Sequence, residues 1–139
     1  MDDPYDLERF VAAQERVYPQ VCAELRRGRK ASHWMWFVFP QIRGLGHSPM
    51  AQKYAIASLA EARAYLDHPV LGARLRECTQ LVVDVEGRTA SEIFGPPDDV
   101  KFRSSMTLFS LAAPEDALFK TALTKYFPSG ADPETLARV

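Results

Sequence analysis

The stretch WMWFVF, from Trp34 to Phe39, decides the fold class, because it is the one segment of the sequence that suggests a β-strand. Its residues are apolar on both alternating faces, which fits a buried strand and a buried helical turn equally well. A strand needs a paired neighbour to satisfy its backbone hydrogen-bonding groups, and a single candidate cannot form a sheet. We therefore expect an all-α protein.

Short helices are predicted on both sides of this stretch. Apolar residues recur at helical spacing in segments 7–14 and 71–82. Asp6 is expected to cap the first of these helices, and Asp98 or Asp99 to cap a later one. Three further helix starts carry capping sequences, Ser48-Pro49, Ser58-x-x-Glu61 and Thr89-x-x-Glu92. The pattern predicts about six to eight short helices in one domain that spans residues 1–139.

The charge balance limits the partners of the chain. Seventeen Lys and Arg residues against eighteen Asp and Glu residues give a net charge of −1, so the basic excess of a general nucleic-acid binder is missing. No apolar stretch is long enough to span a bilayer, and the acidic N-terminus lacks the apolar core of a secretory signal. Cys22 and Cys78 fall on apolar helical positions and are expected to be reduced core thiols. We expect a cytoplasmic monomer that does not contact membranes.

Metal and nucleophile chemistry find little support in the sequence. His33, His47 and His68 have no cysteine, histidine or carboxylate at ligand spacing, so no metal or cofactor is predicted. The Gly-x-Ser-x-Gly turn that presents a nucleophilic serine is missing. Neither cysteine has the accessible, electropositive setting that activates a thiol.

Two segments are basic enough to suggest an anion site. The run from Arg26 to Lys30 places four cations in five residues at the end of a predicted helix. These cations can solvate the C-terminus of the helix, or they can bind a phosphate. In the second case Trp34 and Trp36 would stack a base beside the phosphate, and otherwise the two tryptophans would pack in the core. Loop 43–49, RGLGHSP, contains two glycines that let backbone N–H groups point inward. It fits a plain turn or an anion-binding nest of N–H groups.

Segment 98–106 carries a polar stripe. On a helix, Asp98, Lys101 and Ser105 fall on one side, next to an apolar face that includes Phe102. The stripe fits an exposed Asp–Lys pair with a serine below it. It also fits one wall of a pocket, in which Lys101 and two hydroxyls contact a ligand.

Two longer strings resemble a bacterial family known as domain of unknown function 1810. The first is GRKASHWMWFVFPQIRGLG at 28–46. The second lies within 94–109 and consists of FG at 94–95, Asp98 and KFRSSMTLF at 101–109. Segment 61–75, EARAYLDHPVLGARL, matches the same pattern, so the resemblance covers essentially the whole chain. The resemblance implies a compact, mostly helical single domain, and it implies no established activity. Members have inherited the label calpastatin, but calpastatins are disordered and polar, whereas this composition is that of a packed core.

A shorter similarity links the chain to families that cleave N-glycosidic bonds to ADP-ribose, in riboflavin-pathway and NAD-linked chemistry. Those families are also small and helical, with a Lys- and Trp-bearing pocket near a C-terminal helix that contains Met and Phe. The similar residues here are Lys101, Met106 and Phe109. The similarity supplies no acid–base pair that maps onto this chain.

We predict a pocket for a small anionic or nucleotide-like ligand, with catalysis on ADP-ribose or another N-glycosidic substrate as one form of that function. Arg43 and Lys101 would hold the anion, and a tryptophan would stack a ring. The expected ligand-binding residues are Lys30, His33, Trp34, Trp36, Gln41, Arg43, Gly44, Gly46, Lys101, Ser104 and Ser105. Bond cleavage needs a general acid or base, for which His33, Glu61 and Asp98 are the candidates.

The alternative is a non-catalytic protein-interaction module. In that case the aromatic segment belongs to the core, and the basic turn binds a partner protein. A pocket requires Lys101, Arg43 and His33 to converge around a concave surface. A module requires an exposed apolar patch, with those polar residues scattered.

Overall fold

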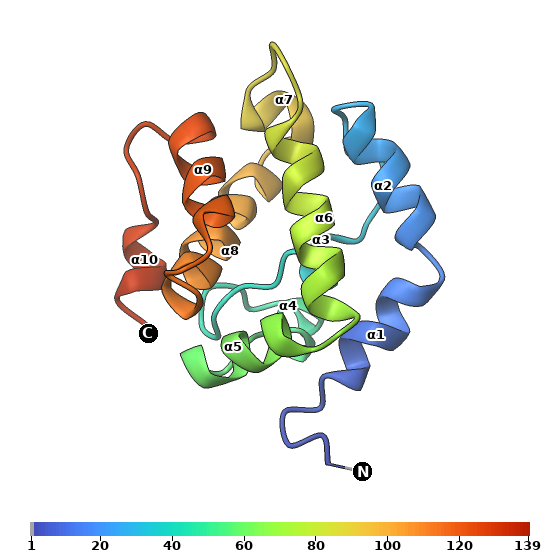
Figure 1. Ribbon diagram of the computed structural model, residues 1–139, viewed down its shortest axis with the longest axis vertical. Helices are drawn as coiled ribbons and strands as arrows, with labels where there is room; N and C mark the ends of the chain where they lie inside the picture. The colour runs from blue at the N-terminus through green and yellow to red at the C-terminus, as the bar shows by residue number, and fades with distance from the viewer. Residues whose placement is uncertain (1) are drawn as a thin grey trace.

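The computed structural model describes residues 2–139 and contains ten helices within that range, with no β-strand among them (Figure 1). They are α1 (Glu8–Glu15), α2 (Tyr18–Arg26), α3 (Met35–Val38), α4 (Pro49–Lys53), α5 (Leu59–Asp67), α6 (Leu71–Val83), α7 (Ala90–Phe94), α8 (Asp98–Ala112), α9 (Ala117–Tyr126) and α10 (Pro133–Leu136). The all-α prediction is confirmed. Six helices have eight residues or more and fall within the predicted number, and α3, α4, α7 and α10 add single turns of four or five residues.

The stretch that decided the fold class forms the helical turn α3, not a strand. Trp34 and Phe39 flank the turn and are each 1% exposed, whereas Trp36 is partly exposed. The Phe39 ring meets the ring of Phe102 on α8 edge-on, with 5.0 Å between centroids. Burial on nearly every side explains why both alternating faces of this stretch are apolar.

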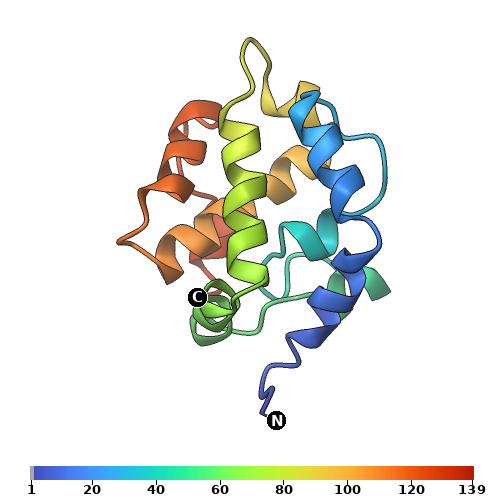
Figure 2. The same cartoon turned by 45° about the vertical axis from the view of Figure 1, so that its right-hand side comes forward.

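Helix α8 lies at the centre of the core. Helices α5, α7, α9 and α10 all pack against it, and every residue from Ser104 to Ser110 is buried. Helix α6 runs along the molecule between α2 and α9, as both ribbon views show (Figures 1 and 2). A helix with neighbours on most sides has no solvent-facing stripe, which explains the weak amphipathic pattern of the α8 sequence.

Side-chain caps fix the start of several helices as predicted. The hydroxyls of Ser48, Ser58 and Thr89 each accept a hydrogen bond from the backbone N–H three residues later. Thr89 and Glu92 form the complete reciprocal capping box. These caps set where α4, α5 and α7 begin.

Two other predicted caps are wrong. Asp6 has a φ of 51°, and the carboxylate of Asp3 accepts from two backbone N–H groups at the start of α1 in its place. At α8 the cap position belongs to Pro97, and Asp98 and Asp99 already lie in the first helical turn. Acidic side chains in that turn still favour the helix, because they complement its dipole.

Cys22 and Cys78 are buried and carry free thiols, as predicted for core residues. Within residues 2–139, no helix combines the length and the apolar character that crossing a bilayer requires. The same range brings together no group of three or more His, Cys, Asp or Glu side chains suited to a metal ion.

Candidate functional site

The loop from Gln41 to His47 is attached to the core through Ile42. This side chain is 2% exposed, and its backbone forms an isolated parallel bridge with Ile56. The Arg43 N–H donates to the Ile56 carbonyl and the Ile56 N–H donates to the Gln41 carbonyl, each at 2.8 Å. This anchor leaves the rest of the loop at the surface, where residues of α4 and α8 face it.

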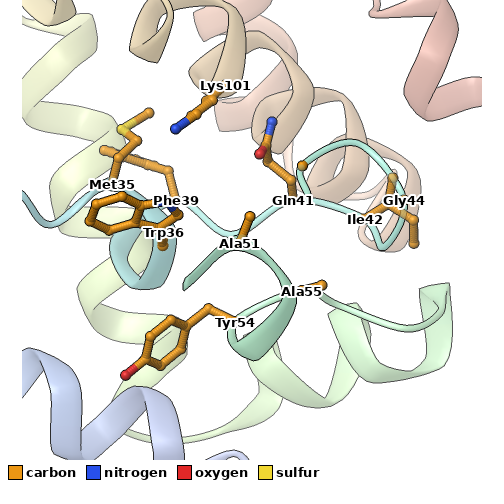
Figure 3. A pocket seen from close by; sticks show the side chains of 11 residues that line it. Met35, Trp36, Phe39, Gln41, Ile42, Gly44, Ala51, Tyr54, Ala55 and Lys101 are labelled. Carbon is orange, nitrogen blue, oxygen red and sulfur yellow. The ribbon is translucent and has the colours of Figure 1, made fainter. Parts of the chain in front are cut away.

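A narrow cavity, the central slot, lies beside this loop (Figure 3). Its volume of about 10 Å³ is room for about one water molecule. It is lined by Met35, Trp36, Phe39, Gln41, Ile42, Gly44, Gly46, Ala51, Tyr54, Ala55 and Lys101. Lys101 reaches in from α8 and Gln41 from the loop, on the same side of Ala51 (Figure 3). The slot therefore joins residues from two distant parts of the sequence.

Lys101 is positioned by an aromatic ring and a shared carboxylate. Its Nζ lies 5.4 Å from the centre of the Trp36 ring and 3.5 Å from Oδ1 of Asp98. The other oxygen of Asp98 lies 2.9 Å from Nζ of Lys30, whose side chain is only 7% exposed. One carboxylate thus serves two ammonium groups. Lys101, the more exposed of the two, keeps positive charge that can attract an anion.

Two larger hollows adjoin the central slot. The loop hollow, of about 390 Å³, is lined by Arg43, Gly44, Gly46, His47, Gln52 and Ala55. The α8 hollow, of about 280 Å³, is lined by Gln41, Leu45, Gly46, Pro97, Val100, Lys101, Ser104, Asp132 and Glu134. Gly46 lines all three spaces, so they lie next to one another around the loop, and we refer to them together as the depression. Ligand sites usually measure roughly 300–1,000 Å³, and each hollow lies near the lower end of that range.

Glycine is favoured at position 44 by the backbone conformation and at position 46 by packing. Gly44 has a φ of +100°, and a Cβ there would lie 2.9 Å from Nε of Arg138. A Cβ at Gly46 would lie 2.6 Å from the Cβ of Ala51 on α4. Within residues 2–139, the backbone N–H groups of both glycines donate to no acceptor. These two N–H groups remain available to an anion.

Several predicted ligand-binding residues lie away from the depression. Trp34 is 1% exposed and its Nε1–H donates to Glu24 at 2.9 Å, so neither face of its ring is free to stack a ligand. The Ser105 hydroxyl is buried without a hydrogen-bond partner, and Ser105 lines none of the three spaces. His33 is exposed before α3 and does not line them either. Lys30 lies behind Asp98, outside all three.

None of the three candidates for a general acid or base lines any of the three spaces. One oxygen of Glu61 lies 2.9 Å from Nη2 of Arg9, and the other accepts from the backbone before α5, so both oxygens hold the fold together. His33 is exposed and outside the depression. Asp98 also lines none of the three spaces, but it is the candidate that contacts a lining residue, because Lys101 lies 3.5 Å from it.

Sequence reasoning missed the contribution of the C-terminal segment. Asp132 and Glu134 line the α8 hollow, and Asp132 ties α10 to α8 by accepting a hydrogen bond from the Ser104 hydroxyl at 2.8 Å. The Asp132-Pro133 pair is a readable start of a helical turn. Its docking site on α8 is not readable, because that contact joins segments far apart in the sequence.

Comparisons with known proteins agree with this fold. A sequence profile of the family described as "Protein of unknown function (DUF1810)" matches residues 4–139. The chain is similar to the crystal structure of a conserved hypothetical protein from Mycobacterium tuberculosis, with 59% sequence identity and a TM-score of 0.96. That match covers 97% of this chain and 96% of the other. Among curated proteins, none matches the chain.

Proposed function

This chain belongs to the DUF1810 family, and we propose that it binds a small anionic ligand in the depression around loop 41–47. The proposal rests on one observation: Trp36, Gln41 and Lys101 all line the same cavity. A helical core does not need an aromatic ring, an amide and an ammonium group at one opening, whereas a ligand site does.

The charges around the loop support an anion as the ligand. Arg43 and His47 line the loop hollow, and neither side chain forms an ion pair within residues 2–139. Lys101 lies at the central slot and shares its carboxylate partner with a second lysine. Gly44 and Gly46 line both spaces, which connects the two sources of positive charge.

Nucleotide-like molecules, including ADP-ribose, belong to this ligand class, and cleavage of an N-glycosidic bond is the form of catalysis we consider. Asp98 is the acid–base candidate that fits this reaction best, because it lies next to Lys101. Its two carboxylate oxygens lie within ion-pair distance of Lys30 and Lys101, at 2.9 and 3.5 Å.

The convergence expected of a pocket is met in part, because Lys101 and Arg43 line neighbouring spaces whereas His33 lines none of them. The alternative, a protein-interaction module, has less support. It requires a contiguous apolar patch, yet the exposed large apolar residues within residues 2–139 belong to several separate elements. They are Met50, Leu59, Val70, Val100, Leu111, Leu136 and Val139.

A thermal-shift screen tests the proposal with inorganic phosphate, sugar phosphates, nucleotides, NAD and ADP-ribose. A ligand at 100 times its Kd adds about 2.7 kcal/mol, which shifts the midpoint by several degrees for a chain of this size. We predict that Lys101→Ala and Arg43→Ala each abolish the shift. Lys120→Ala and Arg16→Ala, which change exposed cations on α9 and after α1, are matched controls that keep it. No shift with any compound, or a shift that survives both site variants, contradicts the proposal.

A further inference from the structure

We infer that the ligand is a phosphomonoester with an aromatic body, which lies across Gly46 with its phosphate in the loop hollow and its body in the α8 hollow. This inference rests on the proposed function and adds the class and the orientation of the ligand. Gly46 lines both hollows, so they are neighbours, and the inference places one molecule across them. Their linings differ in a way that assigns one end of the ligand to each.

The loop hollow has the chemistry of a phosphate site. Arg43, His47 and Gln52 supply its polar side chains, and no carboxylate lines it. A guanidinium group can bind two phosphate oxygens at once, and its donors match their geometry. The N–H groups of Gly44 and Gly46 at the same hollow have no protein acceptor within residues 2–139. The Gln52 amide already donates to the His47 carbonyl at 2.8 Å, so Arg43, His47 and the two glycine N–H groups are the donors that the inference assigns to the phosphate.

The α8 hollow suits an uncharged body. Leu45, Pro97 and Val100 supply apolar surface, and Val100 is 58% exposed. Lys101 also lines this hollow, and Glu134 pairs with Arg138 at 3.0 Å. The carboxylates of Asp132 and Glu134 nevertheless make it less favourable for a phosphate than the loop hollow, whose lining residues within 2–139 include no Asp or Glu. An aromatic ring buries the apolar surface and adds no charge beside the carboxylates. The anionic end of the ligand therefore belongs in the loop hollow.

The sizes of the spaces limit where each part of the ligand can lie. The central slot holds about one water-sized group, so neither a ring nor a phosphate enters it. The loop hollow of about 390 Å³ and the α8 hollow of about 280 Å³ are large enough for these parts. The ligand thus lies over the slot, next to Lys101, which lines the slot and the α8 hollow.

Calorimetric titration with inorganic phosphate, ribose 5-phosphate and adenosine 5′-monophosphate tests the inference. We expect the affinity to rise along this series, with adenosine 5′-monophosphate binding at least tenfold more tightly than phosphate. Arg43→Ala should weaken the binding of all three by tenfold or more. Val100→Glu, at an exposed position that the fold tolerates, should lower the ratio of nucleotide to phosphate affinity at least tenfold. Val70→Glu is the matched control outside the depression and should preserve that ratio.

The outcomes separate this inference from the proposed function. If phosphate binds through Arg43 but the nucleotide binds no more tightly, the anion site stands and the aromatic body is wrong. If Val100→Glu leaves the affinity ratio unchanged, the body does not lie in the α8 hollow and the inference is overturned. If none of the three compounds binds, the proposed function fails together with this inference.

Discussion

Glu24 shows how one buried side chain assigns different roles to two neighbouring tryptophans. It lies on α2 and is fully buried. Its oxygens accept hydrogen bonds from the backbone of Ala31 and Ser32, from the Ser32 hydroxyl and from Nε1 of Trp34, at 2.6 to 3.0 Å. A buried indole N–H needs such an acceptor. Trp34 therefore packs inward, and Trp36 is left to line the central slot.

This carboxylate makes the stability of the fold depend on pH. Burial raises the pKa of Glu24, but hydrogen bonds, chiefly from Ser32 and the Ala31 backbone, lower it from 4.5 to about 2. Because the folded-state pKa is depressed, Glu24 stabilises the fold above pH 4.5, and this contribution is lost as the pH falls towards 2. We predict that Glu24→Gln lowers the free energy of unfolding at pH 7 by about 2–4 kcal/mol. Urea unfolding measures the difference.

The same experiment at several pH values separates charge from packing. The difference between the wild type and Glu24→Gln should shrink as the pH falls from 4.5 to 2, because the wild-type carboxylate becomes protonated. Glu86→Gln, at an exposed position, is the control and should change the stability little at any pH. If the difference in the free energy of unfolding stays constant between pH 4.5 and 2, the charge of Glu24 does not contribute to stability.

Among the helices, α10 depends most on a single side chain. Asp132 caps this helical turn, and one of its oxygens accepts from the hydroxyls of Ser104 and Thr135 at 2.8 and 2.7 Å. Its N–H donates to the Thr107 hydroxyl at 2.9 Å. A helix of four residues is not stable alone, so these contacts with α8 keep α10 in place. They also keep Glu134 at the wall of the α8 hollow.

We predict that Asp132→Asn frees α10 from α8 and leaves the rest of the core folded. Backbone hydrogen exchange should speed up at least tenfold in residues 133–139, because an amide replaces the oxygen that accepts several donors. Exchange in α8 should stay close to that of the wild type. Asp67→Asn, an exposed position at the end of α5, is the control and should change neither segment. Uniformly faster exchange throughout the chain would mean that Asp132 supports the whole fold.

For the molecule as a whole, local sequence patterns predicted the helices but not the tertiary contacts between them. The all-α class followed from the lack of a partner for segment 34–39, and three caps followed from their hydroxyl residues. Core packing was one of the two expectations for Trp34 and Trp36, but the sequence did not show that Trp34 is the buried one, because its acceptor Glu24 lies on another helix. The α8 hollow is built from the loop, the start of α8 and the C-terminal turn, and no local pattern reports such long-range contacts.

The proposed ligand site shares Phe39 and Ile42 with the core, whereas its charged residues Arg43 and Lys101 lie outside the core. Under this proposal, substitutions of the charged residues should affect binding and substitutions in the core should affect stability. Phe102 is fully buried, and its ring contacts those of Phe39 and Phe94 with centroids 5.0 and 4.7 Å apart. We predict that Phe102→Ala lowers the free energy of unfolding by about 3–5 kcal/mol, a large part of the roughly 5–15 kcal/mol of a typical protein. Lys101→Ala and Arg43→Ala should each lower it by less than about 1 kcal/mol, because Arg43 is exposed and Lys101 is partly exposed with an ion pair at 3.5 Å.

Denaturant unfolding followed by circular dichroism measures all three variants under the same conditions. A loss of several kcal/mol in Lys101→Ala would mean that its contacts with Trp36 and Asp98 support the fold. The meeting of these residues would then have a structural explanation that needs no ligand. Near-wild-type stability, together with lost binding, leaves ligand recognition as the reason for an ammonium group above an aromatic ring at the mouth of the slot.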